Sequence, residues 1–127
     1  MKKLHIQILS LLLLLLASCS GSDTYRGAWK ALAENGAQYE IVFDAKTFTV
    51  KDSTGKTEQY KYTQNSVSIK NSVETYGINL SDGRKFKINF PIAEDESVGL
   101  IKDANDRPLY TIGRTKFVQY DDLFKLQ

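Results

Sequence analysis

Histidine and cysteine are almost absent from this chain of 127 residues, which contains one of each. One cysteine cannot build a disulfide framework, and the two residues together are too few for a zinc site within one molecule. The single histidine, His5, lies within residues 1–18, which we expect to be removed, so the remaining chain lacks the usual pairs of a nucleophile and a base, Ser–His and Cys–His. We therefore predict no metal site, no cofactor and no enzymatic activity.

Charge of one sign is also in short supply, since seventeen Lys and Arg oppose fifteen Asp and Glu. Two of the basic residues, Lys2 and Lys3, lie ahead of an apolar stretch at the start of the chain. Without residues 1–18 the two signs are equal in number. A neutral domain has no general electrostatic reason to bind nucleic acid or anionic lipid, so we expect no nucleic-acid partner.

Long apolar runs are limited to one, from Ile8 to Ala17 and interrupted by Ser10. A helix needs roughly twenty residues to cross the apolar core of a bilayer, so this run is too short for a permanent span. A basic start, an apolar centre and small residues before Cys19 are the three parts of a secretory signal. We expect residues 1–18 to be a removable leader.

The quartet Leu16-Ala17-Ser18-Cys19 resembles the bacterial lipoprotein box. The resemblance implies that Cys19 is acylated and becomes the mature N-terminus, with residues 19–23 as a short tether to the membrane. Two or more acyl chains hold a protein stably on a bilayer. In such lipoproteins an Asp directly after the cysteine favours the inner membrane, whereas this chain has Ser20, which implies an outer-membrane anchor facing the periplasm.

From residue 24 to residue 127 the chain reads as one β domain, because apolar and polar residues alternate with a period of two. We predict eight to nine short strands in an antiparallel meander, closed as a small barrel or barrel-like sandwich, and a possible short helix near the C-terminus. A turn is expected at Gln64-Asn65. The residues expected on the buried face include Tyr39, Ile41, Phe43, Phe48, Val50, Tyr60, Tyr62, Val67, Ile69, Tyr76, Ile78, Phe86, Ile88 and Phe90.

Three turns end in glycine, at Gly36, Gly55 and Gly83. A three-residue hairpin loop with glycine in the left-handed last position is a type I turn followed by a bulge. Loops of this kind set the strand registers, and each register matches apolar with apolar residues. The predicted pairs are Trp29 with Ile41, Phe48 with Tyr60, and Ile78 with Phe86.

Gly27-Ala28-Trp29 near the start of the first strand and Arg114 near the end of the last resemble the lipocalin-type (calycin) arrangement. The resemblance implies that Arg114 covers the indole of Trp29 and joins the two ends of a barrel. The chain departs from that family in its short length and in its lack of cysteine pairs, and shorter strands would leave less room for a deep ligand cup.

Tyrosines on the apolar face are the candidate ligand contacts. Buried tyrosine hydroxyls need hydrogen-bond partners, so these side chains form either a core with polar tips or the wall of a small amphipathic pocket. We predict a membrane-anchored envelope lipoprotein that binds a small amphipathic ligand. The alternative is an accessory subunit of an envelope assembly, such as a secretion-system lipoprotein or an inhibitor of a cell-wall enzyme. The candidate ligand-binding residues are Trp29, Tyr39, Tyr60, Tyr62 and Tyr76.

Replacing Cys19 with Ala tests the predicted anchor. Without the sulfur no acyl chain can be attached, so the variant is expected to lose lipid labelling and to be released or left unprocessed. Labelling with a radioactive fatty acid and membrane fractionation measure both outcomes. Unchanged labelling in the variant would contradict the prediction.

Overall fold

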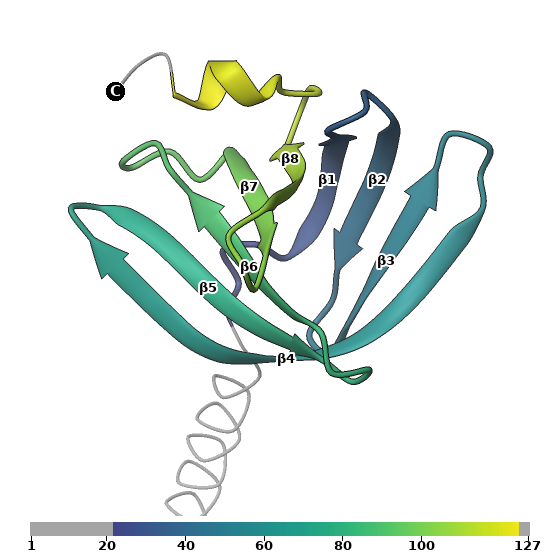
Figure 1. Ribbon diagram of the computed structural model, residues 1–127, viewed down its shortest axis with the longest axis horizontal. Coiled ribbons are helices and arrows are strands. Elements are labelled where there is room, and N and C mark those ends of the chain that lie inside the picture. The colour runs from purple at the N-terminus through teal and green to yellow at the C-terminus, as the bar shows by residue number, and fades with distance from the viewer. Residues whose placement is uncertain (1–21, 125–127) are drawn as a thin grey trace, which may run out of the picture.

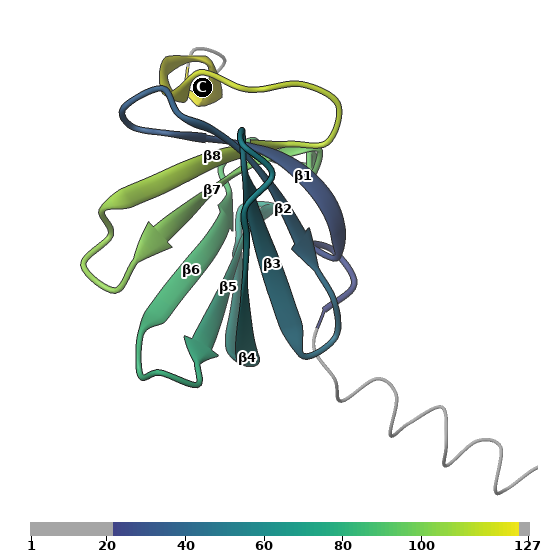
Figure 2. The same ribbon diagram turned by 90° about the vertical axis from the view of Figure 1, so that its right-hand side faces the viewer.

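Eight antiparallel strands form a closed barrel in the computed structural model, which describes residues 22–124. Each strand pairs with the next along the chain, and β1 also pairs with β8, so the sheet closes on itself (Figures 1 and 2). The all-β class and the meander are confirmed. The strands are β1 (Gly27–Ala33), β2 (Gln38–Phe43), β3 (Thr47–Asp52), β4 (Thr57–Lys70), β5 (Val73–Leu80), β6 (Lys85–Phe90), β7 (Val98–Asp103) and β8 (Pro108–Gly113).

The three predicted registers are confirmed: Trp29 lies opposite Ile41, Phe48 opposite Tyr60, and Ile78 opposite Phe86. The glycines that end these loops have φ values of 86°, 92° and 97°, in the left-handed region where glycine is strained least. The β7–β8 loop has the same form, with Asp106 at a φ of 64° in the glycine's place. The four hairpins β1–β2, β3–β4, β5–β6 and β7–β8 are therefore closed by equally short loops.

The predicted turn at Gln64-Asn65 is wrong, because β4 runs through it without reversing. The register with β5 shifts between Gln64 and Ser66, so the extra residue forms a β-bulge instead of a turn. One long strand thus replaces two short ones. The chain reverses at Asn71 and Ser72, which the sequence also marks as a turn, and both residues have the positive φ that a type I′ hairpin turn requires.

The predicted burial of Val67 and Ile69 is also wrong, since the two side chains are 53% and 63% exposed. They share a face with Tyr76 and Glu74, the residues opposite them on β5. However, β3 pairs only with residues 57–61 of β4, so the last part of the β4–β5 hairpin extends past the neighbouring strand. The alternation is correct, but the barrel does not reach far enough to cover these two residues.

Aromatic side chains fill the interior of the barrel. Tyr25, just before β1, is fully buried, and its ring lies 5.4 Å from that of Phe43 and 5.3 Å from that of Tyr76. The rings of Phe43 and Phe48 are 5.1 Å apart and continue the cluster. These rings belong to one cluster of buried side chains inside the barrel.

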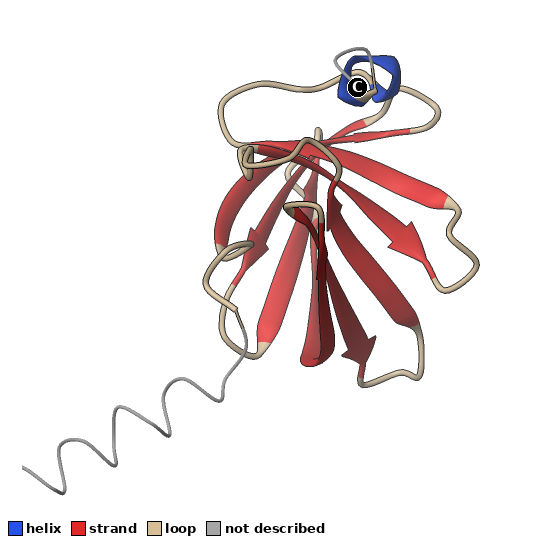
Figure 3. Cartoon of the chain, turned by 90° about the vertical axis from the view of Figure 1, so that its left-hand side faces the viewer, coloured by secondary structure: helices blue, strands red, loops and turns tan. Residues whose placement is uncertain are grey.

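The C-terminal segment, whose helix is blue in Figure 3, packs on β7 through Leu100 and on β8 through a hydrogen bond from the Thr111 hydroxyl to the Val118 oxygen. Its short 3-10 helix, Tyr120–Leu123, stands where a helix was predicted and places Leu123 against Leu100 and Val118. A Cβ on Gly113 would lie 2.3 Å from the carbonyl oxygen of Lys116, so glycine is needed where the segment crosses β8.

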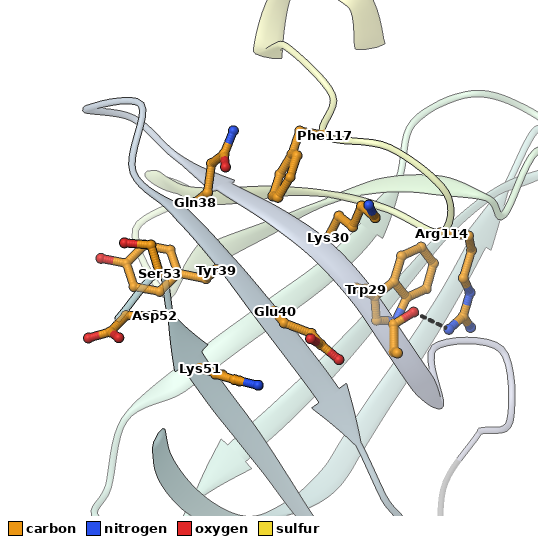
Figure 4. Close-up of a pocket in the computed structure, with 11 residues that line it drawn as sticks. Trp29, Lys30, Gln38, Tyr39, Glu40, Lys51, Asp52, Ser53, Arg114 and Phe117 are labelled. Carbon is orange, nitrogen blue, oxygen red and sulfur yellow. Dashed lines mark hydrogen bonds between the residues drawn. The ribbon is translucent and has the colours of Figure 1, made fainter. Parts of the chain in front are cut away.

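Arg114, directly after β8, lies over Trp29 of β1, with its guanidinium carbon 3.7 Å from the ring centroid (Figure 4). The guanidinium also donates hydrogen bonds to the backbone oxygens of Ala28 (3.1 Å) and Thr24 (3.1 Å). Gly27 has a φ of 95°, and a Cβ there would lie 3.1 Å from Nη1 of Arg114. The glycine therefore supplies both the backbone conformation and the space for this contact.

Replacing Trp29 with Ala is expected to lower the free energy of unfolding by about 3–5 kcal/mol, because the ring is buried and its removal leaves a cavity. Urea unfolding followed by circular dichroism measures the change, because the variant lacks the only tryptophan and cannot be followed by tryptophan fluorescence. Replacing Tyr120, 47% exposed, with Ala is the matched control and should change stability by less than about 0.5 kcal/mol. Equal free energies of unfolding for the two variants would contradict a stabilising role of the buried Trp29 ring.

Candidate functional site

One end of the barrel opens into a cavity of about 420 Å³, which we call the mouth. The short loops β1–β2, β3–β4, β5–β6 and β7–β8 surround it, since alternate connections of a meander lie at the same end. Inward-facing side chains near the strand ends form its wall. The lining residues are Ala33, Tyr39, Phe48, Val50, Asp52, Lys56, Glu58, Tyr60, Arg84, Phe86, Leu109 and Tyr110.

Aromatic rings make up most of the apolar wall. Tyr39 and Tyr110 meet edge to face with their centroids 5.4 Å apart, and Phe48 lies 5.2 Å from Tyr60. Phe48 is buried and closes the floor, whereas the other three rings are partly exposed. The mouth thus presents ring surfaces that the barrel itself leaves uncovered.

Arg84 is the cation that lies closest to these rings. Its guanidinium carbon is 5.1 Å from the ring centroid of Tyr60 and 5.5 Å from that of Phe86. Asp82 holds it from the adjacent loop, accepting hydrogen bonds from Nε at 3.0 Å and Nη2 at 2.8 Å. Stacking and ion pairing together fix the planar group at the rim.

Two tyrosine hydroxyls of the mouth, those of Tyr60 and Tyr110, have raised pKa values and remain neutral hydrogen-bonding groups. Burial raises the pKa of Tyr110, and the hydrogen bond to Glu58 raises the pKa of Tyr60. The hydroxyl of Tyr60 donates to the Glu58 carboxylate, a partner on the same face of β4. The rim therefore carries charges of both signs around a ring of aromatic side chains.

The structure places the five tyrosine and tryptophan candidates in three locations. Tyr39 and Tyr60 line the mouth. Tyr62 and Tyr76 are buried toward the opposite end, where their hydroxyls donate to the backbone oxygen of Asp44 and to Glu74. Trp29 is buried beneath Arg114.

Sequence reasoning did not select Phe86, Tyr110 and Arg84 as ligand contacts. Tyr110 alternates with Ile112 on β8, a signal that would have placed it inside the barrel. Arg84 follows a turn glycine, and apolar alternation gives no sign of a charged side chain folded over two rings. Arg84 contacts Tyr60 of β4 and Phe86 of β6, two strands that lie on either side of β5 in the sheet.

A second cavity, of about 490 Å³, lies on the outer surface of β1, β2 and β3 (Figure 4). Phe117 and Lys30 contact each other there, with Nζ 5.5 Å from the ring centroid. Glu40 and Lys51 project from neighbouring strands, and Trp29 and Arg114 form one side. Lys30 already covers the ring of Phe117 and Arg114 that of Trp29, so the mouth is the better candidate for an apolar ligand.

Within residues 22–124, no group of three or more His, Cys, Asp and Glu side chains is placed to hold a metal ion. The same residues contain no helix of the length and apolarity needed to cross a bilayer. Cys19 lies outside the described residues. No family model, curated protein or solved structure matches this chain.

Acid should weaken the loops that frame the mouth. The pKa of Asp82 is lowered by its hydrogen bonds to Arg84, and that of Asp52 by hydrogen bonds within its own loop, from Thr54 first. A carboxyl whose pKa is lower in the folded state stabilises the fold above its unfolded pKa of about 4 and loses that effect as the pH falls.

Urea unfolding at about pH 5 and about pH 3 measures this loss. Replacing Asp82 with Asn keeps an acceptor for the Arg84 backbone N–H but removes the titrating group. The variant should therefore lose less stability than the parent between the two values. An equal loss would show that Asp82 does not contribute.

Proposed function

We propose that this protein is a lipid-anchored protein of the bacterial envelope whose barrel mouth binds a small amphipathic ligand without catalysing a reaction. The observation that carries the proposal is the mouth itself, where partly exposed aromatic rings line the wall and the guanidinium of Arg84 lies at the rim beside Tyr60 and Phe86. A ligand with one apolar and one polar part would place the first against Tyr39 and Tyr110 and the second at the rim.

The size and shape of the mouth support a small ligand. Its volume of about 420 Å³ lies within the range of roughly 300–1,000 Å³ that is usual for small-molecule sites. Because Phe48 and the packed core lie beneath it, the ligand would remain partly in contact with solvent. This excludes full enclosure of a long acyl chain in the barrel.

The closed barrel with Gly27, Trp29 and Arg114 at its seam is compatible with a lipocalin-like domain. A relationship with that family is part of the proposal, as are acylation at Cys19 and attachment to the outer membrane facing the periplasm. The lipoprotein box at residues 16–19 supports the anchor.

The alternative is an accessory subunit of an envelope assembly, including an inhibitor of a cell-wall enzyme. Exposed apolar side chains at two separate places favour it. Val67 and Ile69 project from the β4–β5 hairpin, and Tyr120 and Phe124 stack on each other near the C-terminus with centroids 5.0 Å apart. Such residues are typical of protein interfaces when they lie together on a surface.

Binding of 1-anilinonaphthalene-8-sulfonate, an aromatic anion, tests the mouth of the full chain. Replacing Tyr110 with Ala removes a wall and should weaken binding about tenfold, equivalent to about 1.4 kcal/mol. Replacing Arg84 with Gln should also weaken it, because the sulfonate loses its cation. Fluorescence titration measures both dissociation constants.

Lys85 provides the matched control for Arg84. It is the next residue, exposed, and alternation directs it outward from the barrel, so Lys85→Gln removes the same charge away from the mouth. This variant should bind like the parent. Equal weakening in the two charge variants, or no effect of Tyr110→Ala, would argue against the mouth as the binding site.

A further inference from the structure

The second half of β4 has an open edge. Within residues 22–124, β3 pairs with β4 only over residues 57–61, and the last link on that side is the Tyr62 backbone N–H to the Lys46 oxygen at 2.9 Å. Gln64 is still covered, because its side-chain oxygen accepts hydrogen bonds from the Ser22 backbone N–H and the Tyr25 hydroxyl. From Ser66 to Lys70, β5 alone pairs with the strand among the described residues.

At the open edge, no described strand other than β5 lies beside the backbone groups of Val67 and Ile69. The backbone N–H of Leu80 donates to the Arg84 oxygen, so the backbone groups of Leu80 point toward β6. The backbone groups of every second residue along β5 point in the same direction. Tyr76 and Glu74 are two of these, and they lie opposite Val67 and Ile69. Opposite residues in such a pair both point their backbone groups outward, so the N–H and C=O groups of Val67 and Ile69 point away from β5, toward the open edge.

The middle of this edge, residues 66–69, carries none of the devices that keep natural strand edges from pairing. Lysine, proline and bulges usually protect such an edge. Here the bulge at Asn65 lies at its beginning and Lys70 at its end, while Ser66, Val67, Ser68 and Ile69 between them are uncharged. The apolar side chains of Val67 and Ile69 are more than half exposed on one face.

We infer that two copies of this chain pair antiparallel through the β4 edge, with Ser68 on the two-fold axis. In that register Val67 of each copy lies opposite Ile69 of the other, and each such pair exchanges backbone hydrogen bonds. Lys70 lies opposite Ser66, so no charge meets a like charge. A register one residue away would place Val67 opposite Ser68 and lose the apolar match.

The segment is self-complementary in three respects: backbone groups, apolar side chains and charge. This is what an isologous contact requires, since the same patch must fit itself. On the face of the joined sheets that carries Val67 and Ile69, the four side chains of the two copies form one apolar strip. On the opposite face, the two Ser68 side chains meet at the axis. The inference does not depend on ligand binding at the mouth.

Sedimentation equilibrium of the full chain in detergent tests the pairing through three variants. Val67→Pro removes a backbone N–H that points to the open edge, so β5 keeps its own hydrogen bonds. Ile69→Lys places a charge in the apolar strip. Each should raise the dimer dissociation constant at least about tenfold. Gln59→Lys is the control, because residue 59 is exposed on the part of β4 that already has β3 beside it.

A monomeric parent chain, or a dimer unaffected by both edge variants, would overturn the inference. Circular dichroism of each variant separates loss of pairing from loss of folding. If Val67→Pro does not fold, Ile69→Lys alone decides, because its side chain is already exposed in the monomer.

Disulfide trapping in intact cells tests the register. Ser68→Cys places two thiols opposite each other in a non-hydrogen-bonded pair, where side chains are closest, and should give a covalent dimer on mild oxidation. Lys70→Cys should not, because its partner in the second copy is Ser66. The parent chain, whose one cysteine is Cys19, is the control for any disulfide that forms without an added cysteine. Stronger trapping through Lys70→Cys than through Ser68→Cys would overturn the proposed pairing.

Discussion

Closure of the sheet between β1 and β8 is the constraint on which the rest of the structure depends. Every other pairing joins strands that are consecutive in the chain, whereas this one joins residues 30–33 to residues 110–113. Bringing such distant segments together costs chain entropy, and the hydrogen bonds that offset this cost form only when the edges of β1 and β8 pair with each other. Arg114 over Trp29 adds a contact at this seam and ties the N-terminal segment through the oxygen of Thr24. Gly27 leaves room for that arrangement, which explains why the first strand begins with glycine.

The two ends of the barrel are built differently. At the mouth, side-chain oxygens of Asp52, Asp82 and Asp103 accept backbone N–H groups within their own loops, so the rim is held by local hydrogen bonds. At the other end Tyr25 enters the core and its hydroxyl reaches Gln64, closing the interior. A rim held by such local bonds would suit the ligand site that we propose, because little order would have to be gained on binding.

Much of the fold could be predicted from the sequence because alternation and loop length act locally. Apolar parity and the glycine loops defined three registers, each a consequence of a few neighbouring residues. The bulge at Asn65 could not be read in this way, since Gln64-Asn65 is as compatible with a turn as with an irregular strand. The exposure of Val67 and Ile69 depends on where β3 stops, a property of another strand. The site was predicted least well: Tyr39 and Tyr60 line the mouth, but Arg84 reaches it through packing between strands that are not adjacent in sequence.

The position of Tyr25 sets the direction in which the mouth faces. Residues 22–25 are fixed to the base of the barrel through Gln64 and the aromatic core, while β1 runs from there to the rim. With the anchor at Cys19 that we propose, the base of the barrel would face the membrane and the mouth would face the surrounding water. The proposed ligand would then reach the mouth by diffusion through the aqueous compartment and not from the bilayer, so solubility in water would limit which molecules could bind.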